Sequence, residues 1–137
     1  MFTKIMVPVD LGHVDRTEKA LSVAADLAKN YGAQATVVGV TQSSPTDVAP
    51  TPAAFGEKLS AFAAAKSETL GVPLAAHSEV SHDISVDLDA VLQRAAEGLG
   101  ADLIVMASHV PGFAEHIFAS NAGYLASHTT ISVFVVR

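Results

Sequence analysis

Four polar side chains stand directly after an apolar run or at the start of a helical pattern, where a ligand could reach them: Asp10, His109, Ser120 and Asn121. A carboxylate at the end of a strand either caps the next turn or faces a ligand. Hydroxyl and amide groups at a helix start suit phosphate, because the backbone N–H groups there favour anions, but such residues are also ordinary helix caps. His109 either contacts phosphate or hydrogen-bonds the backbone of its own loop. These residue types fit a phosphorylated small molecule.

Other kinds of chemistry lack the residues that they need. The chain has no cysteine, which excludes disulfides, a thiolate nucleophile, iron–sulfur clusters and cysteine-bound zinc. It has neither the P-loop motif nor Gly-x-Gly-x-x-Gly after the first apolar run. The remaining histidines show neither the i, i+4 spacing nor the carboxylate partner of a metal site, so we expect surface or structural roles and no protein-bound metal at His13, His77, His82, His116 and His128.

Charge limits both the partners and the chemistry. Eight Lys and Arg against fourteen Asp and Glu give a formal net charge of −6, which argues against nucleic acid and an anionic membrane surface. Residues 95–136 contain no Lys or Arg, so a phosphate group bound there would depend on backbone N–H groups, hydroxyls, the helix dipole, a cation and protonated His109. We therefore expect low to moderate affinity for a phosphorylated ligand. We expect no catalysis, because the sequence offers no evident general base. Glu115, the only acid in its loop, suits a solvated surface position.

The elements that position these residues follow from the apolar pattern. With 137 residues, half of them apolar, the chain suits one domain over 1–137. Strands are expected at 5–9, 35–40, 74–80, 103–106 and 132–136. Helices are expected at 15–31, at 55–70, from 83 or 85 to about 98, and at about 120–127. Asp15 with Glu18 is predicted to cap the first helix, and Gly32 to end it.

Alternating strands and helices predict an α/β fold, an open five-stranded parallel sheet with helices on both faces. The most apolar strands, 5–9 and 103–106, are placed at its centre, which gives the order 3-2-1-4-5. Ligands of such sheets bind outside the carboxyl ends of the strands where the order reverses. That point lies between the loops 10–14 and 107–119, so the four polar residues should converge there. Strand 132–136 is expected at an edge, where an apolar strand tends to pair with another chain.

Several short motifs, taken in order, resemble the universal stress protein family over essentially the whole chain. Ile-Met-Val-Pro-Val-Asp at 5–10 is similar to the family's first strand, and Ser-Val-Phe-Val-Val-Arg at 132–137 to its last. Ala107-Ser108-His109-x-Pro111 and Ser120-Asn121-Ala122, with His128, resemble a subgroup that uses Ala-Ser-His-x-Pro and Gly-Ser-Asn-Ala. The resemblance implies a Rossmann-like fold of the adenine nucleotide alpha hydrolase type. It also implies ATP or AMP at the reversal point, with Mg²⁺ as an accompanying ion, and a homodimer paired through the last strand.

The resemblance also implies a set of nucleotide-binding residues. Asp10 would face a ribose hydroxyl or a bound metal, and the backbone at strand ends would frame the adenine. The full set is Pro8, Val9, Asp10, Val40, Met106, Ala107, Ser108, His109, Gly112, Ala119, Ser120, Asn121, Ala122, Ser132, Val133 and Phe134. The family's nucleotide binders carry Gly-x-x-Gly and a later Gly-Ser or Gly-Thr. The three glycines are replaced here by Ala107, Val110 and Ala119, and the Cβ of Ala119 would meet an approaching phosphate.

The function implied is that of a non-catalytic nucleotide-binding regulator in stress response or signalling. Two alternatives stay open: an interaction module of the same fold without nucleotide, which the missing glycines favour, and a slow ATPase. A cytoplasmic location is expected, because the sequence shows neither a signal-peptide stretch nor an apolar window long enough for a membrane helix. The sequence does not identify a client protein.

Overall fold

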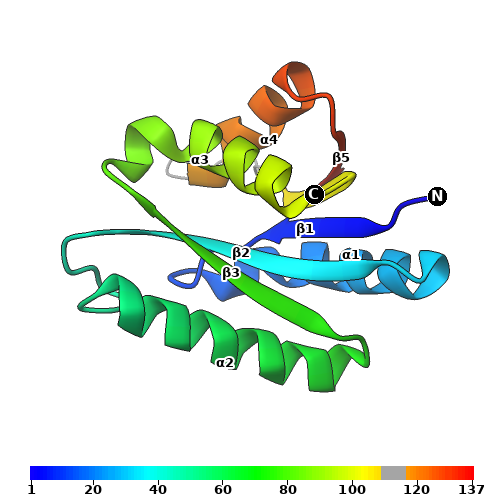
Figure 1. Ribbon diagram of the computed structural model, residues 1–137, viewed down its shortest axis with the longest axis horizontal. Helices are drawn as coiled ribbons and strands as arrows, with labels where there is room; N and C mark the ends of the chain where they lie inside the picture. The colour runs from blue at the N-terminus through cyan, green and yellow to red at the C-terminus, as the bar shows by residue number, and fades with distance from the viewer. Residues whose placement is uncertain (109–116) are drawn as a thin grey trace.

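Strands and helices alternate along the chain in the computed structural model, which describes residues 1–108 and 117–137, with the side chains of 117–121 excepted (Figure 1). The elements are β1 (Lys4–Pro8), the 3-10 turn η1 (Val14–Thr17), α1 (Glu18–Tyr31), β2 (Gln34–Gln42), α2 (Pro52–Leu70), β3 (Leu74–Ser81), α3 (Ile84–Leu99), β4 (Leu103–Ala107), α4 (Ile117–His128) and β5 (Ser132–Val136).

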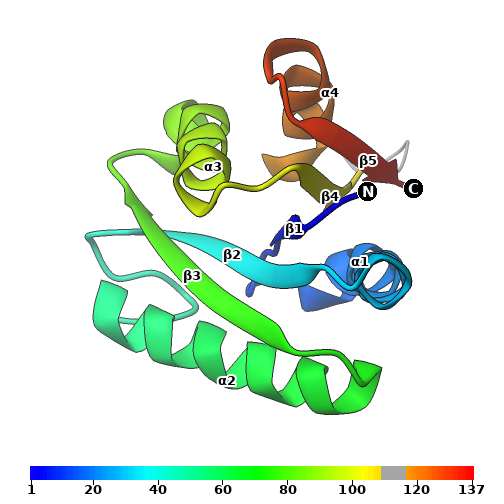
Figure 2. The ribbon, with the colours of Figure 1, turned by 45° about the vertical axis from the view of Figure 1, so that its right-hand side comes forward.

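The sheet has the predicted topology. Its five strands lie in the order β3-β2-β1-β4-β5, and every neighbouring pair is parallel. Helices α1 and α2 cover one face, and α3 and α4 cover the other (Figure 2). The prediction of an open α/β sheet with its order reversing between β1 and β4 is therefore confirmed.

The central strand β1 contributes side chains to two separate cores, because its side chains alternate between the faces of the sheet. Ile5 and Val7 point into the core beneath α1 and α2. Met6 points into the other core, where it joins Ile104 of β4 and Leu92 of α3. A strand buried on both faces must be apolar at every position, which explains the unbroken apolar run that identified β1 in the sequence.

Helix ends agree with the sequence more closely than helix starts. Gly32, which ends α1, adopts the left-handed conformation with φ of 65° that a side chain would disfavour. The predicted cap of Asp15 with Glu18 is wrong. The chain first makes the turn η1, and Thr17 becomes the N-cap residue of α1 without a capping bond from its side chain. The hydroxyl of Thr17 donates instead to the carbonyl of Val14 at 2.9 Å.

Helix α4 also begins before the predicted start, because it is helical from Ile117 onward. Ser120 therefore lies one turn inside the helix rather than at its cap. Among the helices in the described parts of the chain, none is both long and apolar enough to cross a membrane.

Candidate functional site

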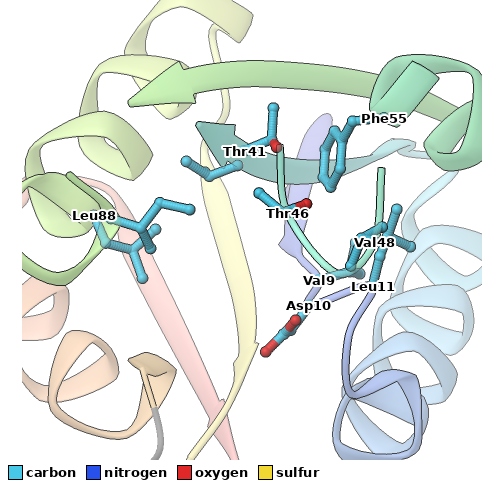
Figure 3. A pocket seen from close by; sticks show the side chains of 10 residues that line it. Val9, Asp10, Leu11, Thr41, Thr46, Val48, Phe55 and Leu88 are labelled. Atoms are coloured by element: carbon cyan, nitrogen blue, oxygen red, sulfur yellow. The ribbon is translucent and has the colours of Figure 1, made fainter. Parts of the chain in front are cut away.

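A cavity of about 120 Å³ lies at the carboxyl ends of β1 and β2, between the first turns of α2 and α3 (Figure 3). This volume is below the usual range for a whole ligand pocket, so the cavity suits one ring of a larger ligand. It is lined by Val9, Asp10, Leu11, Val40, Thr41, Thr46, Val48, Phe55, Ile84 and Leu88.

The strand register places the predicted site residues of β1, β2 and β4 at the same level of the sheet. Pro8 pairs with Val38, and continuing that register makes Asp10 level with Val40 on β2. The register of β1 with β4, continued in the same way, makes Asp10 level with Ser108. The β1, β2 and β4 ends therefore meet at one edge of the sheet, as the predicted topology requires.

Apolar side chains form most of the cavity wall. Leu88 of α3 stands on one side, and Phe55 of α2 stands with Val48 on the other (Figure 3). Phe55 approaches β2 closely because Gly39 has no side chain. A Cβ at Gly39 would lie 2.8 Å from Cζ of the Phe55 ring, which is closer than real contacts allow. The result is a slot with apolar walls that suits the faces of a planar ring.

The segment after β2 closes the cavity and is held in place twice. Within the segment, the Thr46 hydroxyl donates to the Ala49 carbonyl and accepts from the Ala49 N–H, each at 3.2 Å. Lys58 of α2 donates from Nζ to the carbonyl of Val48, which ties the segment to that helix. A segment with its own turn and a tie to a neighbouring helix presents Thr46 and Val48 to the cavity in fixed positions.

Asp10 stands at the mouth of the cavity, and both of its carboxylate oxygens have partners. Oδ1 accepts the backbone N–H of Gly12 at 2.9 Å. Oδ2 lies 3.1 Å from Nδ1 of His13, and the N–H of His13 donates to the Asp10 carbonyl at 3.0 Å. Asp10 therefore organises the turn after β1, and it is also one of the residues that line the cavity.

Two of the other histidines have a carboxylate partner that the sequence analysis did not predict. His13 pairs with Asp10, and His77 lies 3.0 Å from Glu79 on β3. The spacings are i, i+3 within a loop and i, i+2 along a strand, so a search for helical i, i+4 pairs does not detect them. Neither pair extends to a third acidic or histidine side chain suited to a metal ion within residues 1–108 and 117–137.

The structure brings three of the predicted site residues into the cavity wall: Val9, Asp10 and Val40. Ser108 is close to them in register, and its N–H donates to the carbonyl of Val136 at 2.7 Å. Other predicted residues lie elsewhere. Met106 and Ala122 are buried in the core beneath α3 and α4.

The predicted residues of β5 do not reach the carboxyl ends of the strands, where the cavity lies. Ser132 and Val133 pair with Leu103 and Ile104, the first residues of β4, and Phe134 pairs with Val105 at its middle. Pro8 and Ala107 are the last residues of β1 and β4. His109 and Gly112 fall outside the described residues, and Ala119, Ser120 and Asn121 are described only as part of the backbone of α4.

Sequence reasoning did not identify the outer walls of the cavity: Leu11, Thr41, Thr46, Val48, Phe55, Ile84 and Leu88. One signal was available. Val48 is an apolar residue in a connection otherwise rich in Ser, Thr and Pro, and such a residue suggests a loop that packs inward. The position of Phe55 depends on the close approach to Gly39, which requires knowledge of how α2 crosses β2.

Comparisons with a family model, with related sequences and with solved structures all indicate the same family. The family model described as "Universal stress protein family" matches residues 1–137. Universal stress protein G of Shigella flexneri is 28% identical over 152 residues that cover 100% of each protein. A universal stress protein structure from Archaeoglobus fulgidus superposes with a TM-score of 0.72 at 20% identity, covering 100% of both chains. A structure from the same organism in complex with dAMP gives 0.70 at 20% identity, covering 98% of both chains.

Proposed function

Because the chain belongs to the universal stress protein family, we propose that it binds an adenine nucleotide, ATP or AMP, at the carboxyl ends of β1, β2 and β4. The cavity beside Asp10 is the observation that carries this proposal. It is narrow, has mostly apolar walls, and ends at a carboxylate. A purine ring between the side of Leu88 and the side of Phe55, with its ribose toward Asp10, fits that arrangement. The relative from A. fulgidus in complex with dAMP supports the same class of ligand.

The phosphates would extend from the ribose toward β4 and α4. In this proposal Ala107, Ser108, His109 and Gly112 lie along the phosphates, and Ala119, Ser120 and Asn121 approach them from the first turns of α4. Free backbone N–H groups at the start of a helix favour anions. Mg²⁺ would be held by the phosphates, because the described residues offer no group of three suitable ligands and both Asp10 oxygens already have partners.

We propose that the protein acts as a non-catalytic regulator and homodimer, with β5 as the pairing strand. β5 is an edge strand of the sheet. Its side chains Phe134 and Val135 are 44% and 37% exposed, although both are apolar. An exposed apolar edge is a site for pairing with a second strand, and antiparallel pairing about a two-fold axis closes both edges at once.

Calorimetric titration with adenosine, AMP and ATP tests the proposed site. Asp10→Ala removes the proposed ribose contact. Because a hydrogen bond to a charged group is lost, the affinity for each of the three ligands should fall about ten-fold. Asp26→Ala, which removes an exposed carboxylate from α1, is the matched control and should leave binding unchanged. Mass spectrometry of the denatured protein would also identify a nucleotide that stays bound through purification.

Failure of all three ligands to bind at millimolar concentration would reject the nucleotide proposal. It would favour an interaction module of the same fold, in agreement with the replacement of the family glycines by Ala107, Val110 and Ala119.

A further inference from the structure

We propose that the Thr41 side chain selects the base, through a hydrogen bond between its hydroxyl and the six-membered ring of a 6-aminopurine. The inference rests on the proposed nucleotide site and assigns base selection within it to one residue. Thr41 is the next-to-last residue of β2 and lines the cavity.

Thr41 is a buried residue whose hydroxyl is unused. It is only 3% exposed, and no hydrogen bond within the described parts of the chain involves its hydroxyl. Ser81 of β3 also has a hydroxyl without a partner among the described residues, but that oxygen is closed off inside the protein. The Thr41 oxygen is not closed off in this way, and Thr41 lines the cavity, so its hydroxyl is accessible to a ligand there.

The other polar side chains of the cavity wall already have partners. The Thr46 hydroxyl forms two hydrogen bonds with Ala49, and both carboxylate oxygens of Asp10 are engaged in the turn after β1. Thr41 is therefore the polar side chain of the described cavity wall whose hydrogen-bonding capacity is wholly unused. A buried hydroxyl without a partner is unfavourable, and a ligand atom that bonds to it removes that cost.

Thr41 lies where the far edge of a bound purine would be. Gly39 and Thr41 are two residues apart on β2 and so share a face of the sheet, which is the face that Phe55 approaches at Gly39. Figure 3 shows Thr41 at one end of the cavity and Asp10 at the other. With the ribose toward Asp10, the part of the purine that lies farthest from the ribose points toward Thr41. That part is the edge of the six-membered ring with N1 and the substituent at position 6.

A hydroxyl matches this edge of a 6-aminopurine, because it can donate one hydrogen bond and accept another. N1 of the ring accepts, and the neighbouring 6-amino group donates. The Thr41 hydroxyl would donate to N1 and accept from the amino group. A purine with hydrogen at position 6 keeps only the first of these bonds, so the site should favour the 6-aminopurine.

The test compares adenosine with purine riboside, which has hydrogen in place of the 6-amino group, by calorimetric titration. In the unchanged protein, adenosine should bind about three- to ten-fold more tightly, as expected for one neutral hydrogen bond. Thr41→Val replaces the hydroxyl by a methyl group of similar size and should bind the two ligands with nearly equal affinity. Thr41→Ser keeps the hydroxyl and should keep the preference for adenosine.

Thr36→Val is the matched control, because it makes the same change earlier on the same strand, at a position that does not line the cavity. It should keep the preference for adenosine. Denaturant unfolding without ligand gives a second measurement. Thr41→Val should be at least as stable as the unchanged protein, since it removes a buried hydroxyl that has no partner.

Three results would reject the role of Thr41 while the nucleotide site stands: equal binding of both ligands by the unchanged protein, a preference for adenosine that persists in Thr41→Val, or a loss of stability in Thr41→Val. Loss of the preference in Thr41→Ser would also reject it. Absence of adenosine binding by the unchanged protein would instead reject the nucleotide site, and this inference with it.

Discussion

Gly39 determines the position of the Phe55 ring, and through it one wall of the cavity. A methyl group at Gly39 would lie 2.8 Å and 2.9 Å from two atoms of that ring and 3.2 Å from Leu59. Gly39→Ala should therefore lower the free energy of unfolding by about 1–3 kcal/mol, as overpacking does, and weaken adenosine binding. Denaturant unfolding and calorimetry measure the two effects.

Gly98→Ala is the control for this substitution, because a Cβ at Gly98 in α3 meets no atom within 4 Å. It should raise stability by about 0.5–1 kcal/mol, since glycine is unfavourable inside a helix. Adding Phe55→Leu to Gly39→Ala should recover part of the lost stability by making room for the methyl group. No loss of stability in Gly39→Ala would show that Phe55 can move aside freely.

Ala119 stands where the family's nucleotide binders carry the glycine of their Gly-Ser or Gly-Thr motif. Ala119→Gly removes the Cβ that would keep phosphate away from the backbone N–H groups at the start of α4. We expect ATP binding to tighten more than adenosine binding, with a loss of up to about 1 kcal/mol in stability because α4 contains Ala119. Equal tightening of both ligands, or no change in calorimetry, would show that Ala119 does not limit phosphate binding.

At the residue scale, the sequence predicted only part of the cavity wall. Val9, Asp10 and Val40 could be identified because strand ends in an α/β sheet meet at a known place. The opposite walls come from the first turns of α2 and α3, and their approach depends on packing that no short motif encodes. The pairing of His13 with Asp10 depends on the turn after β1, which differs from the predicted cap.

At the scale of the elements, β1 and β4 are joined at their amino ends by one side chain. Asp102, directly before β4, accepts the backbone N–H groups of Thr3 and Lys4 at 2.9 and 3.0 Å, and also the Thr3 hydroxyl at 2.9 Å. Burial alone would raise the pKa of the Asp102 carboxyl. The hydrogen bonds from Lys4 and Thr3 outweigh that effect and hold the pKa below its ordinary value.

This lowered pKa makes the contribution of Asp102 to stability depend on pH. The carboxylate stabilises the folded protein fully above the unfolded pKa of about 3.9, and the contribution disappears as the pH falls through the lower folded value. Asp102→Asn should lower the free energy of unfolding by about 1 kcal/mol at neutral pH, a small effect because solvent still reaches this partly buried carboxylate. The unfolding free energies of the two proteins should converge in strong acid.

Asp26→Asn, on the exposed face of α1, is the control for that measurement and should keep the acid dependence of the unchanged protein. A constant difference between Asp102→Asn and the unchanged protein at every pH would contradict the assignment of the titration to Asp102.

Element boundaries could be predicted best where glycine sets them. Gly32, Gly71 and Gly100 end α1, α2 and α3 with φ of 65°, 68° and 65°. Helix starts were less predictable because several polar residues compete to be the cap. Thr51 caps α2 by accepting the Ala54 N–H at 3.1 Å, so that helix begins earlier than the predicted residue 55.

At the scale of the whole molecule, the exposed edge of β5 leads to a test of the proposed dimer. Val135→Lys places like charges opposite each other across a two-fold axis and should shift the protein toward monomer in sedimentation. Val135 is a better position than Val133, which packs against the core beneath α3 and α4. Val86→Lys, at a 75% exposed position on α3, is the control. An unchanged dimer in Val135→Lys would place the interface elsewhere.

The order of the strands in the sheet has a consequence for the chain as it leaves the ribosome. β1, β2 and β3 are neighbours in both sequence and space, so three strands can pair before β4 is synthesised. The walls of the cavity come from residues between Val9 and Leu88, whereas the proposed phosphate contacts begin after β4. A nascent chain thus has all the walls of the cavity, the proposed pocket for the base, while the segment proposed to contact the phosphates is still untranslated. One free edge of β1 would stay open until β4 docks on it.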